Sequence, residues 1–95
     1  MELLSERELA AAIFELQDWG GDSLVLRRSQ EFASFPQAIE AVDRVAVIAE
    51  ELDHHPDMDI RWRTVTFMVS THSAGGVTAA DVELARRIDA TIAEL

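Results

Sequence analysis

The sequence contains no cysteine, no lysine and no apolar run of the roughly 20 residues that cross a bilayer. Without cysteine there are no disulfides, no thiolate metal ligands and no cysteine nucleophile. Nucleic acids are bound by clustered basic side chains, but the eight basic residues here are all arginines and are scattered along the chain. We therefore expect no nucleic-acid partner and no binding to an anionic membrane. Because the first residues do not have the pattern of a secretion signal, we also expect a cytoplasmic protein.

The composition is typical of one small globular domain. The 95 residues are 48% hydrophobic and 27% charged, and the net charge is −10. A chain of this length has room for one small core but not for two. We predict a single domain over residues 1–95, whose acidity favours solubility. Domains of this size often gain stability by self-association.

Capping patterns predict a helix at each end of the chain. Ser5 and Glu8 have the spacing of a capping box, and the helical apolar pattern that follows ends near Gln17. Thr78 and Asp81 have the same spacing before the last apolar stripe. An acidic residue at the third position of a helix is a common structural feature, so Asp81 has an ordinary explanation as well as a functional one.

A longer central helix is predicted after Ser34, with Gln37 completing a capping box, and it must end before Pro56. Its apolar stripe comprises Phe35, Ala38, Ile39, Val42, Val45, Ala46, Ala49 and Leu52. Three further apolar residues lie outside that stripe, namely Ala41, Val47 and Ile48. A helix more apolar than one core requires suggests a subunit contact.

Extended segments fill the spaces between these helices. Alternating patterns predict strands over residues 24–32, 60–63 and 65–69, with a short partner for the first of them near 17–19. The side chains expected to face the helices from the last strand are Val65, Phe67 and Val69. The element order α-β-β-α-β-β-α predicts an α+β fold with two layers, in which three helices cover one face of a four-stranded antiparallel sheet.

The three histidines lie at predicted element ends. His54 and His55 follow the central helix, and His72 follows the last strand. If the fold brings these ends together, three imidazoles that titrate near neutral pH converge. Glu50 lies four residues before His54 and is expected beside it on the last helical turn. The alternative is that the adjacent pair only interacts with the helix dipole and that His72 is a surface loop residue.

Other readings of these residues remain open at this point. Three imidazoles and a carboxylate could bind zinc, and a zinc hydrolase is therefore a further hypothesis. Against it, His54 and His55 are adjacent, and the His-x-x-x-His spacing common on helices is absent. Trp62 is either a stacking wall for a flat ligand or a buried aromatic, and the core is the better default.

Taken together, these residues resemble one known family, the pterin-4a-carbinolamine dehydratases, along essentially the whole chain. The resemblance is carried by four motifs: Glu50-x-x-x-His54-His55-Pro56-Asp57, Trp62-x-x-Val65, Ser70-Thr71-His72 and Gly76-Val77-Thr78-x-x-Asp81-Val82. It implies the α+β fold described above, assembled as dimers or tetramers. It also implies dehydration of 4a-hydroxytetrahydropterin to quinonoid dihydropterin, in tetrahydrobiopterin recycling, with no metal and no organic cofactor.

The resemblance also implies roles for particular residues. His54 and His72 would be the acids that serve the 4a-hydroxyl from opposite pterin faces, and His55 would position the substrate. Further substrate-binding or orienting residues would be Glu50, Pro56, Ser70, Thr71, Asp81 and Trp62. The backbone of Ser70 and Thr71 would pair with the edge of the pterin ring.

One departure from the family pattern concerns the pocket wall. Met58 stands two residues after the proline, where many members have an aromatic residue. The family's second role also implies an alternative function, that of a non-catalytic dimerisation or assembly module that binds a protein partner. Since non-catalytic relatives would be expected to lose histidines, the presence of all three favours the enzyme.

Overall fold

The computed structural model describes all residues 1–95 and has the predicted order of elements. None of its helices has the length and apolarity that crossing a membrane requires. The elements are α1 Glu6–Glu15, β1 Gly20–Gly21, β2 Leu26–Glu31, α2 Phe35–Leu52, β3 Asp57–Arg61, β4 Thr64–Val69, the short 3₁₀ helix η1 His72–Ala74, and α3 Ala79–Ala93.

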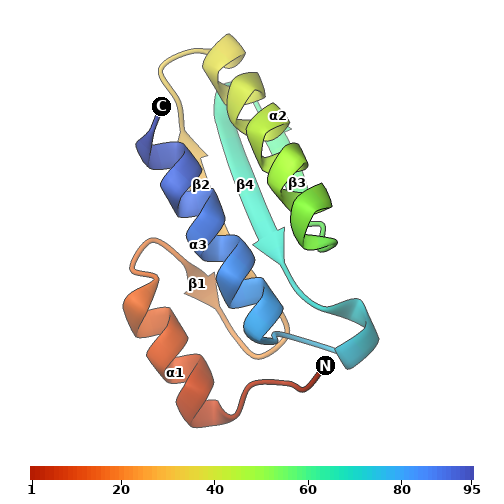
Figure 1. Ribbon diagram of the computed structural model, residues 1–95. Helices are drawn as coiled ribbons and strands as arrows, with labels where there is room; N and C mark the ends of the chain where they lie inside the picture. The colour runs from red at the N-terminus through yellow and green to blue at the C-terminus, as the bar shows by residue number, and fades with distance from the viewer.

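The four strands form one antiparallel sheet in the order β1-β2-β4-β3. The long strands β2 and β4 lie at its centre, and β3 is an edge strand. Figure 1 shows α2 and α3 side by side across one face of this sheet, with α1 beside β1. The predicted α+β fold is therefore confirmed.

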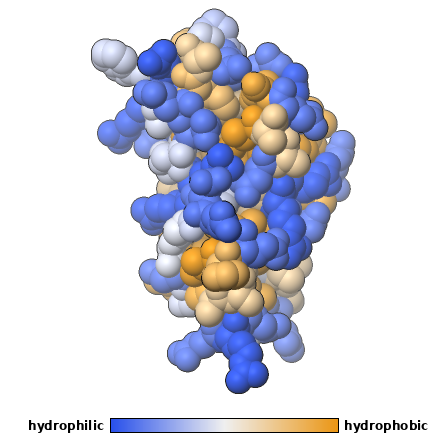
Figure 2. All heavy atoms as spheres, turned by 90° about the vertical axis from the view of Figure 1, so that its left-hand side faces the viewer, coloured by the Kyte–Doolittle hydropathy of each residue, from blue (hydrophilic) through white to orange (hydrophobic).

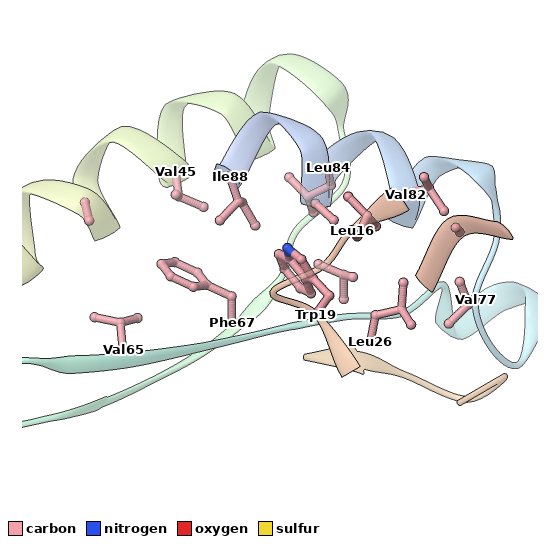
Figure 3. Close-up of a cluster of buried hydrophobic side chains, with 14 of the residues drawn as sticks. Leu16, Trp19, Leu26, Val45, Val65, Phe67, Val77, Val82, Leu84 and Ile88 are labelled. Atoms are coloured by element: carbon pink, nitrogen blue, oxygen red, sulfur yellow. The ribbon is translucent and has the colours of Figure 1, made fainter. Parts of the chain in front are cut away.

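The core lies between that face and the helices. Strand β4 alternates between buried and half-buried residues along its length, as expected for a strand with one face on a core. Figure 3 shows Val65 and Phe67 pointing from β4 towards Val45 of α2 and Ile88 of α3. The inward side chains predicted on this strand, Val65, Phe67 and Val69, are all fully buried.

Helix α2 buries most of the predicted stripe, with differences at its edges: Ala38, Val45 and Ala49 are buried, and Val42 and Leu52 pack against the core. Ala41, expected outside the apolar stripe, is fully buried, whereas Phe35 at the start of the stripe is exposed. Ile48 packs against the core and Val47 remains exposed. Helix α3 lies against α2, so the face that α2 buries depends on this neighbour as well as on the sheet.

The helix starts follow the predicted caps with one change. At α1, Ser5 and Glu8 form the capping box, each side chain bonding the other's backbone N–H. At α2, the Gln37 N–H donates to Ser34 Oγ at 3.2 Å, but the Gln37 side chain accepts from the Ala33 N–H instead of from Ser34. The cap residue was therefore correct, and the complete box was wrong.

The short first strand lies at Gly20–Gly21 and not at the predicted 17–19. Trp19 belongs to the core and not to the strand: its side chain is buried, and its Nε1 donates to Asp89 Oδ1 of α3 at 2.7 Å. The same Oδ1 accepts from Arg28 of β2 at 2.5 Å. This cluster ties the start of the sheet to α3, which local sequence patterns do not reveal.

Hydrophilic side chains cover much of the face seen in Figure 2. On the face seen in Figure 2, hydrophobic patches are separated by hydrophilic side chains. This agrees with a chain that carries 18 acidic and eight basic residues. The arrangement leaves the most distinctive polar contacts of the molecule at the end of the sheet where α2 stops and β4 ends.

Candidate active site

The end of helix α2 orients the two adjacent histidines. Asp53 adopts the left-handed conformation, with φ 50° and ψ 44°. The His54 N–H donates to the Ala49 carbonyl at 3.0 Å and the Asp53 N–H to the Glu50 carbonyl at 3.2 Å, which is the Schellman pattern of a helix C-terminus. The helix thus ends before Pro56, as predicted, but Asp53 makes the turn. Asp is among the few non-glycine residues that tolerate this conformation.

After this turn, His54 points towards α3. Its Nε2 atom lies 2.5 Å from Oδ1 of Asp81, and the histidine side chain is only 16% exposed. Asp81 is 0% exposed and is the third residue of α3, in the position expected from the capping pattern. The contact joins two residues 27 positions apart in the chain.

Buried hydrogen bonds surround the Asp81 carboxylate. Its Oδ2 accepts from the Thr71 hydroxyl at 2.8 Å and from the Thr78 backbone N–H at 2.8 Å. The Thr71 hydroxyl is also 2.8 Å from the Thr78 hydroxyl and 3.5 Å from His54 Nε2. A buried carboxylate is costly unless it is paired and hydrogen-bonded, and this one has a partner for each oxygen.

Glu50 was expected beside His54, and that expectation is wrong. The structure pairs Glu50 with His55 through Oε2 and Nε2. The left-handed turn at Asp53 carries His54 away from the helix surface, so the carboxylate meets the next histidine instead. Both partners of this pair are exposed, so the pair lies on the rim and not inside the buried cluster.

His72 is the first residue of η1 and directly follows Thr71. It is exposed and makes no hydrogen bond to another side chain of the chain. Thr71 therefore connects the buried His54–Asp81 pair to the strand end that carries His72. No three histidine, aspartate and glutamate side chains are grouped closely enough to ligate one metal ion, so the zinc hypothesis has no ligand set.

Three other predicted site residues occupy different surroundings. The Ser70 hydroxyl donates to the Leu24 carbonyl at 2.6 Å, and Pro56 is half-buried beside the histidines in sequence. Trp62, for which a core position was the default, is 91% exposed at the β3–β4 turn, with φ 56°. Since β3 separates it from Asp57 by five residues, Trp62 lies about 16 Å from the histidine end in the same chain.

The backbone of Thr71 is already engaged. Its N–H donates to the Gly76 carbonyl at 2.9 Å, and its own carbonyl accepts from Ala74 and Gly75. Ser70, which precedes it, makes no backbone–backbone hydrogen bond outside the helices and strands. Of the two residues expected to offer backbone groups to a ligand, only Ser70 has them free.

Sequence reasoning missed two members of this site. Asp53 sets the direction of both histidines, and its only sequence signal was an Asp directly after the last helical residue. Thr78 was treated as a helix cap, but its hydroxyl also joins the buried cluster through Thr71. No local pattern predicts that second contact, because it depends on β4 and α3 meeting in space.

The fold and the site together define a class of protein: a small two-layer α+β domain with a buried His–Asp pair at the end of its sheet, suited to proton transfer. Within that class, residues 2–91 match the family model described as "Pterin 4 alpha carbinolamine dehydratase". The chain belongs to this family.

Relatives and solved structures agree with that assignment. A protein of Nocardia farcinica, whose name places it in the same family, is 56% identical over 88 residues, covering 93% of each chain. The crystal structure of a "transcriptional coactivator/pterin dehydratase" from Brucella melitensis superposes with a TM-score of 0.88 at 33% identity, covering 93% of this chain and 96% of that one. A pterin dehydratase-like RuBisCO assembly factor of the α-carboxysome, at 23% identity and a TM-score of 0.64 over 77% of this chain and 84% of that one, shares only the fold.

Proposed function

We propose that this protein dehydrates 4a-hydroxytetrahydropterin to quinonoid dihydropterin and water by histidine general acid–base catalysis, in the recycling of tetrahydrobiopterin. The observation that carries the proposal is the buried contact between His54 Nε2 and Asp81 Oδ1 at the sheet end that also bears His72. Membership of the pterin-4a-carbinolamine dehydratase family supplies the substrate class.

The reaction needs two proton movements. The C4a–O bond breaks when the hydroxyl is protonated and leaves as water, and loss of the N5 proton completes the C4a=N5 double bond. Histidine can donate or accept a proton near neutral pH, and a positioned acid or base accelerates such a step by about 10² to 10⁴-fold. No metal or organic cofactor enters this balance.

The proposed roles follow the family's pattern on the residues present. His54 and His72 serve the 4a-hydroxyl from opposite pterin faces, and His55, oriented by Glu50, positions the substrate. Ser70 offers its free backbone groups to the ring edge, and Pro56 lines the site. Trp62 of the same chain lies outside this arrangement, so a contact with substrate requires another copy of the chain.

The direct test is an assay of the purified protein with enzymatically generated 4a-hydroxytetrahydropterin. We expect turnover above the spontaneous rate, measured beside an established dehydratase as the positive control. Failure to exceed the spontaneous rate while the control enzyme works would contradict the proposal.

The His72→Ala variant tests the histidine role. We expect the catalysed rate to fall by roughly 10- to 10⁴-fold, the range for loss of a general acid, with an unchanged melting temperature because His72 is exposed. The matched control is Arg61→Ala, at the opposite end of β3, which should retain the wild-type rate. An unchanged rate in His72→Ala would mean that His72 is only a loop residue.

A further inference from the structure

Two threonine hydroxyls lie against the candidate acid–base pair. Thr71 and Thr78 are buried, their hydroxyl oxygens are 2.8 Å apart, and Thr71 Oγ1 is 2.8 Å from Asp81 Oδ2. A hydroxyl carries a single hydrogen and accepts through its lone pairs. The assignment that uses each hydrogen best is Thr78 donating to Thr71 and Thr71 donating to Asp81. The two other acceptors near the Thr78 hydroxyl are weaker, because the sulfur of Met1 is a weak acceptor and Asp81 Oδ2 lies 3.5 Å away.

This chain of donors settles how the Asp81 carboxylate is used. Oδ2 holds the Thr71 hydroxyl and the Thr78 backbone N–H, which leaves Oδ1 for His54. An ionised carboxylate can only accept. With Asp81 as the carboxylate of the pair, the hydrogen between Oδ1 and the imidazole, across 2.5 Å, is assigned to Nε2 of His54.

The other ring nitrogen of His54 faces a different environment. Nδ1 makes no hydrogen bond within the chain, whereas Nε2 contacts both Asp81 and Thr71. Only one side-chain nitrogen or oxygen of a residue that is not exposed is both buried from solvent and without a hydrogen-bond partner, and that atom is Nε of Arg28. Since Nδ1 of His54 also lacks a partner but is not such an atom, it must be accessible. Nδ1 of His54 is therefore unpartnered and open to solvent or to a bound molecule.

We propose that Thr71 and Thr78 are positioning residues which act through Asp81 to hold neutral His54 in the tautomer protonated at Nε2, so that Nδ1 is the nitrogen that exchanges a proton with the substrate. The identity of the substrate rests on the proposed function, but the tautomer does not. In the dehydration, Nδ1–H of the imidazolium gives its proton to the 4a-hydroxyl as water leaves. The proton released from N5 passes to solvent water and His54 regains a proton from solvent, so the step is balanced.

The tautomer can be read directly from the unmodified protein by long-range ¹H–¹⁵N NMR of its three ¹⁵N-labelled histidines. The His54 signals are assigned by their absence in a His54→Gln variant, and the spectra are recorded from pH 6 to pH 9. We expect the neutral His54 imidazole to carry its hydrogen on Nε2, with Nδ1 unprotonated. A neutral imidazole with its hydrogen on Nδ1, or an equal mixture of the two tautomers, would overturn the inference.

The threonine role is tested with Thr71→Val and Thr71→Ser. The valine variant removes one hydrogen bond to Asp81, and we expect a mixture of His54 tautomers and a dehydration rate lowered about tenfold, the scale of one hydrogen bond. The serine variant keeps the hydroxyl and should restore both readouts. The matched control is Thr66→Val, elsewhere on β4, which removes a hydroxyl that contacts Ser29 of β2. It should change neither the tautomer nor the rate. A valine variant with the wild-type tautomer and rate would overturn the role of Thr71.

The two measurements separate this inference from the proposed function. A protein without dehydratase activity whose His54 is protonated at Nε2 would overturn the function and support the tautomer. An active dehydratase whose His54 is protonated at Nδ1 would do the reverse.

Discussion

One residue, Asp53, decides where the chain goes after helix α2. It is one of only two non-glycine residues with positive φ, the other being Trp62. The left-handed conformation costs an ordinary L-residue about 1–2 kcal/mol, and Asp is among the residues that adopt it most readily. The backbone geometry that directs His54 to Asp81 therefore depends on a residue with no part in the proposed chemistry.

Substitutions at Asp53 should separate backbone strain from side-chain chemistry. We expect Asp53→Val to lower the free energy of unfolding by about 1–2 kcal/mol, because a β-branched residue is strongly disfavoured at positive φ. Asp53→Gly should remain within about 1 kcal/mol of the wild type, because glycine adopts this conformation freely. Urea denaturation measures both values.

The control for this pair is Asp57→Val, which makes the same chemical change at a residue that is exposed and has no positive φ. It should change stability little. Equal losses in Asp53→Val and Asp57→Val would show that the left-handed turn is not the cause.

At the scale of elements, one ion pair joins α1 to α3. Arg86 Nε donates to Glu15 Oε2 at 2.6 Å, and its terminal nitrogen to Oε1 at 2.9 Å. The Arg86 hydrogen bond lowers the pKa of the Glu15 carboxyl below its ordinary value, and the pKa of Arg86 is raised by the same contact. Both side chains are about half exposed, 49% for Arg86 and 50% for Glu15, so solvent screens the pair and it is a modest link between the two helices.

This link predicts a particular pH dependence of stability. A carboxyl whose pKa is lower in the folded state stabilises the fold above its unfolded pKa of about 4.3, and that contribution is lost as the pH falls through the folded value. We therefore expect Glu15→Gln to be less stable than the wild type at pH 6, with the difference shrinking below about pH 4.3. Thermal melts across this range measure it.

Glu6→Gln serves as the control, since it removes an exposed carboxylate of the same helix that has no ion pair with an arginine. It should not reproduce the pH-dependent difference. A Glu15→Gln difference that stayed constant down to pH 3 would contradict the electrostatic origin.

The features that could be predicted from the sequence are those that lie within a single helix or strand. Caps and alternation are local signals, so the helix starts at Ser5 and Ser34 and the inward face of β4 were predicted correctly. The stripe on α2 was only partly correct: its Ala38, Val45 and Ala49 are buried, but so is Ala41 beside it, while Phe35 is exposed. Periodicity describes one element, while burial depends on the element packed against it.

The site shows the same boundary between local and tertiary information. The resemblance named His54 and Asp81, but spacing alone paired His54 with Glu50. The actual partner lies 27 residues away. The exposed position of Trp62 could not be predicted either, because an aromatic residue in an alternating segment is most often part of the core. The structure places Trp62 in the two-residue turn between the paired residues Arg61 and Thr64, and this turn lies away from the core.

At the scale of the whole molecule, the net charge disfavours association between copies of the chain, whereas exposed apolar surface favours it. Family resemblance implies dimers or tetramers, and the exposed Val47 lies in a groove of about 360 Å³ between α2 and α3 that Ile48 and Ala90 also line. Each copy carries a net charge of −10, so copies repel one another at long range. Two of the charged residues along the groove, Arg44 and Arg87, are positive, which reduces that repulsion locally.

We predict that copies of this chain associate through this groove and that added salt strengthens the association. The Debye length falls from about 10 Å at 0.1 M salt to about 3 Å at 1 M, so added salt screens the repulsion between copies while leaving apolar contacts in place. We expect sedimentation velocity to show a larger oligomeric fraction at 0.5 M than at 0.05 M sodium chloride. Val47→Glu should weaken association at least tenfold at both concentrations, because removing a charge from water into an apolar contact is costly. Phe14→Ser, which removes an exposed aromatic from α1, should leave association unchanged.

Two outcomes would contradict this prediction. If Val47→Glu associates like the wild type, the contact between copies lies elsewhere on the surface. If salt dissociates the oligomer, ion pairs and not apolar contacts hold the copies together.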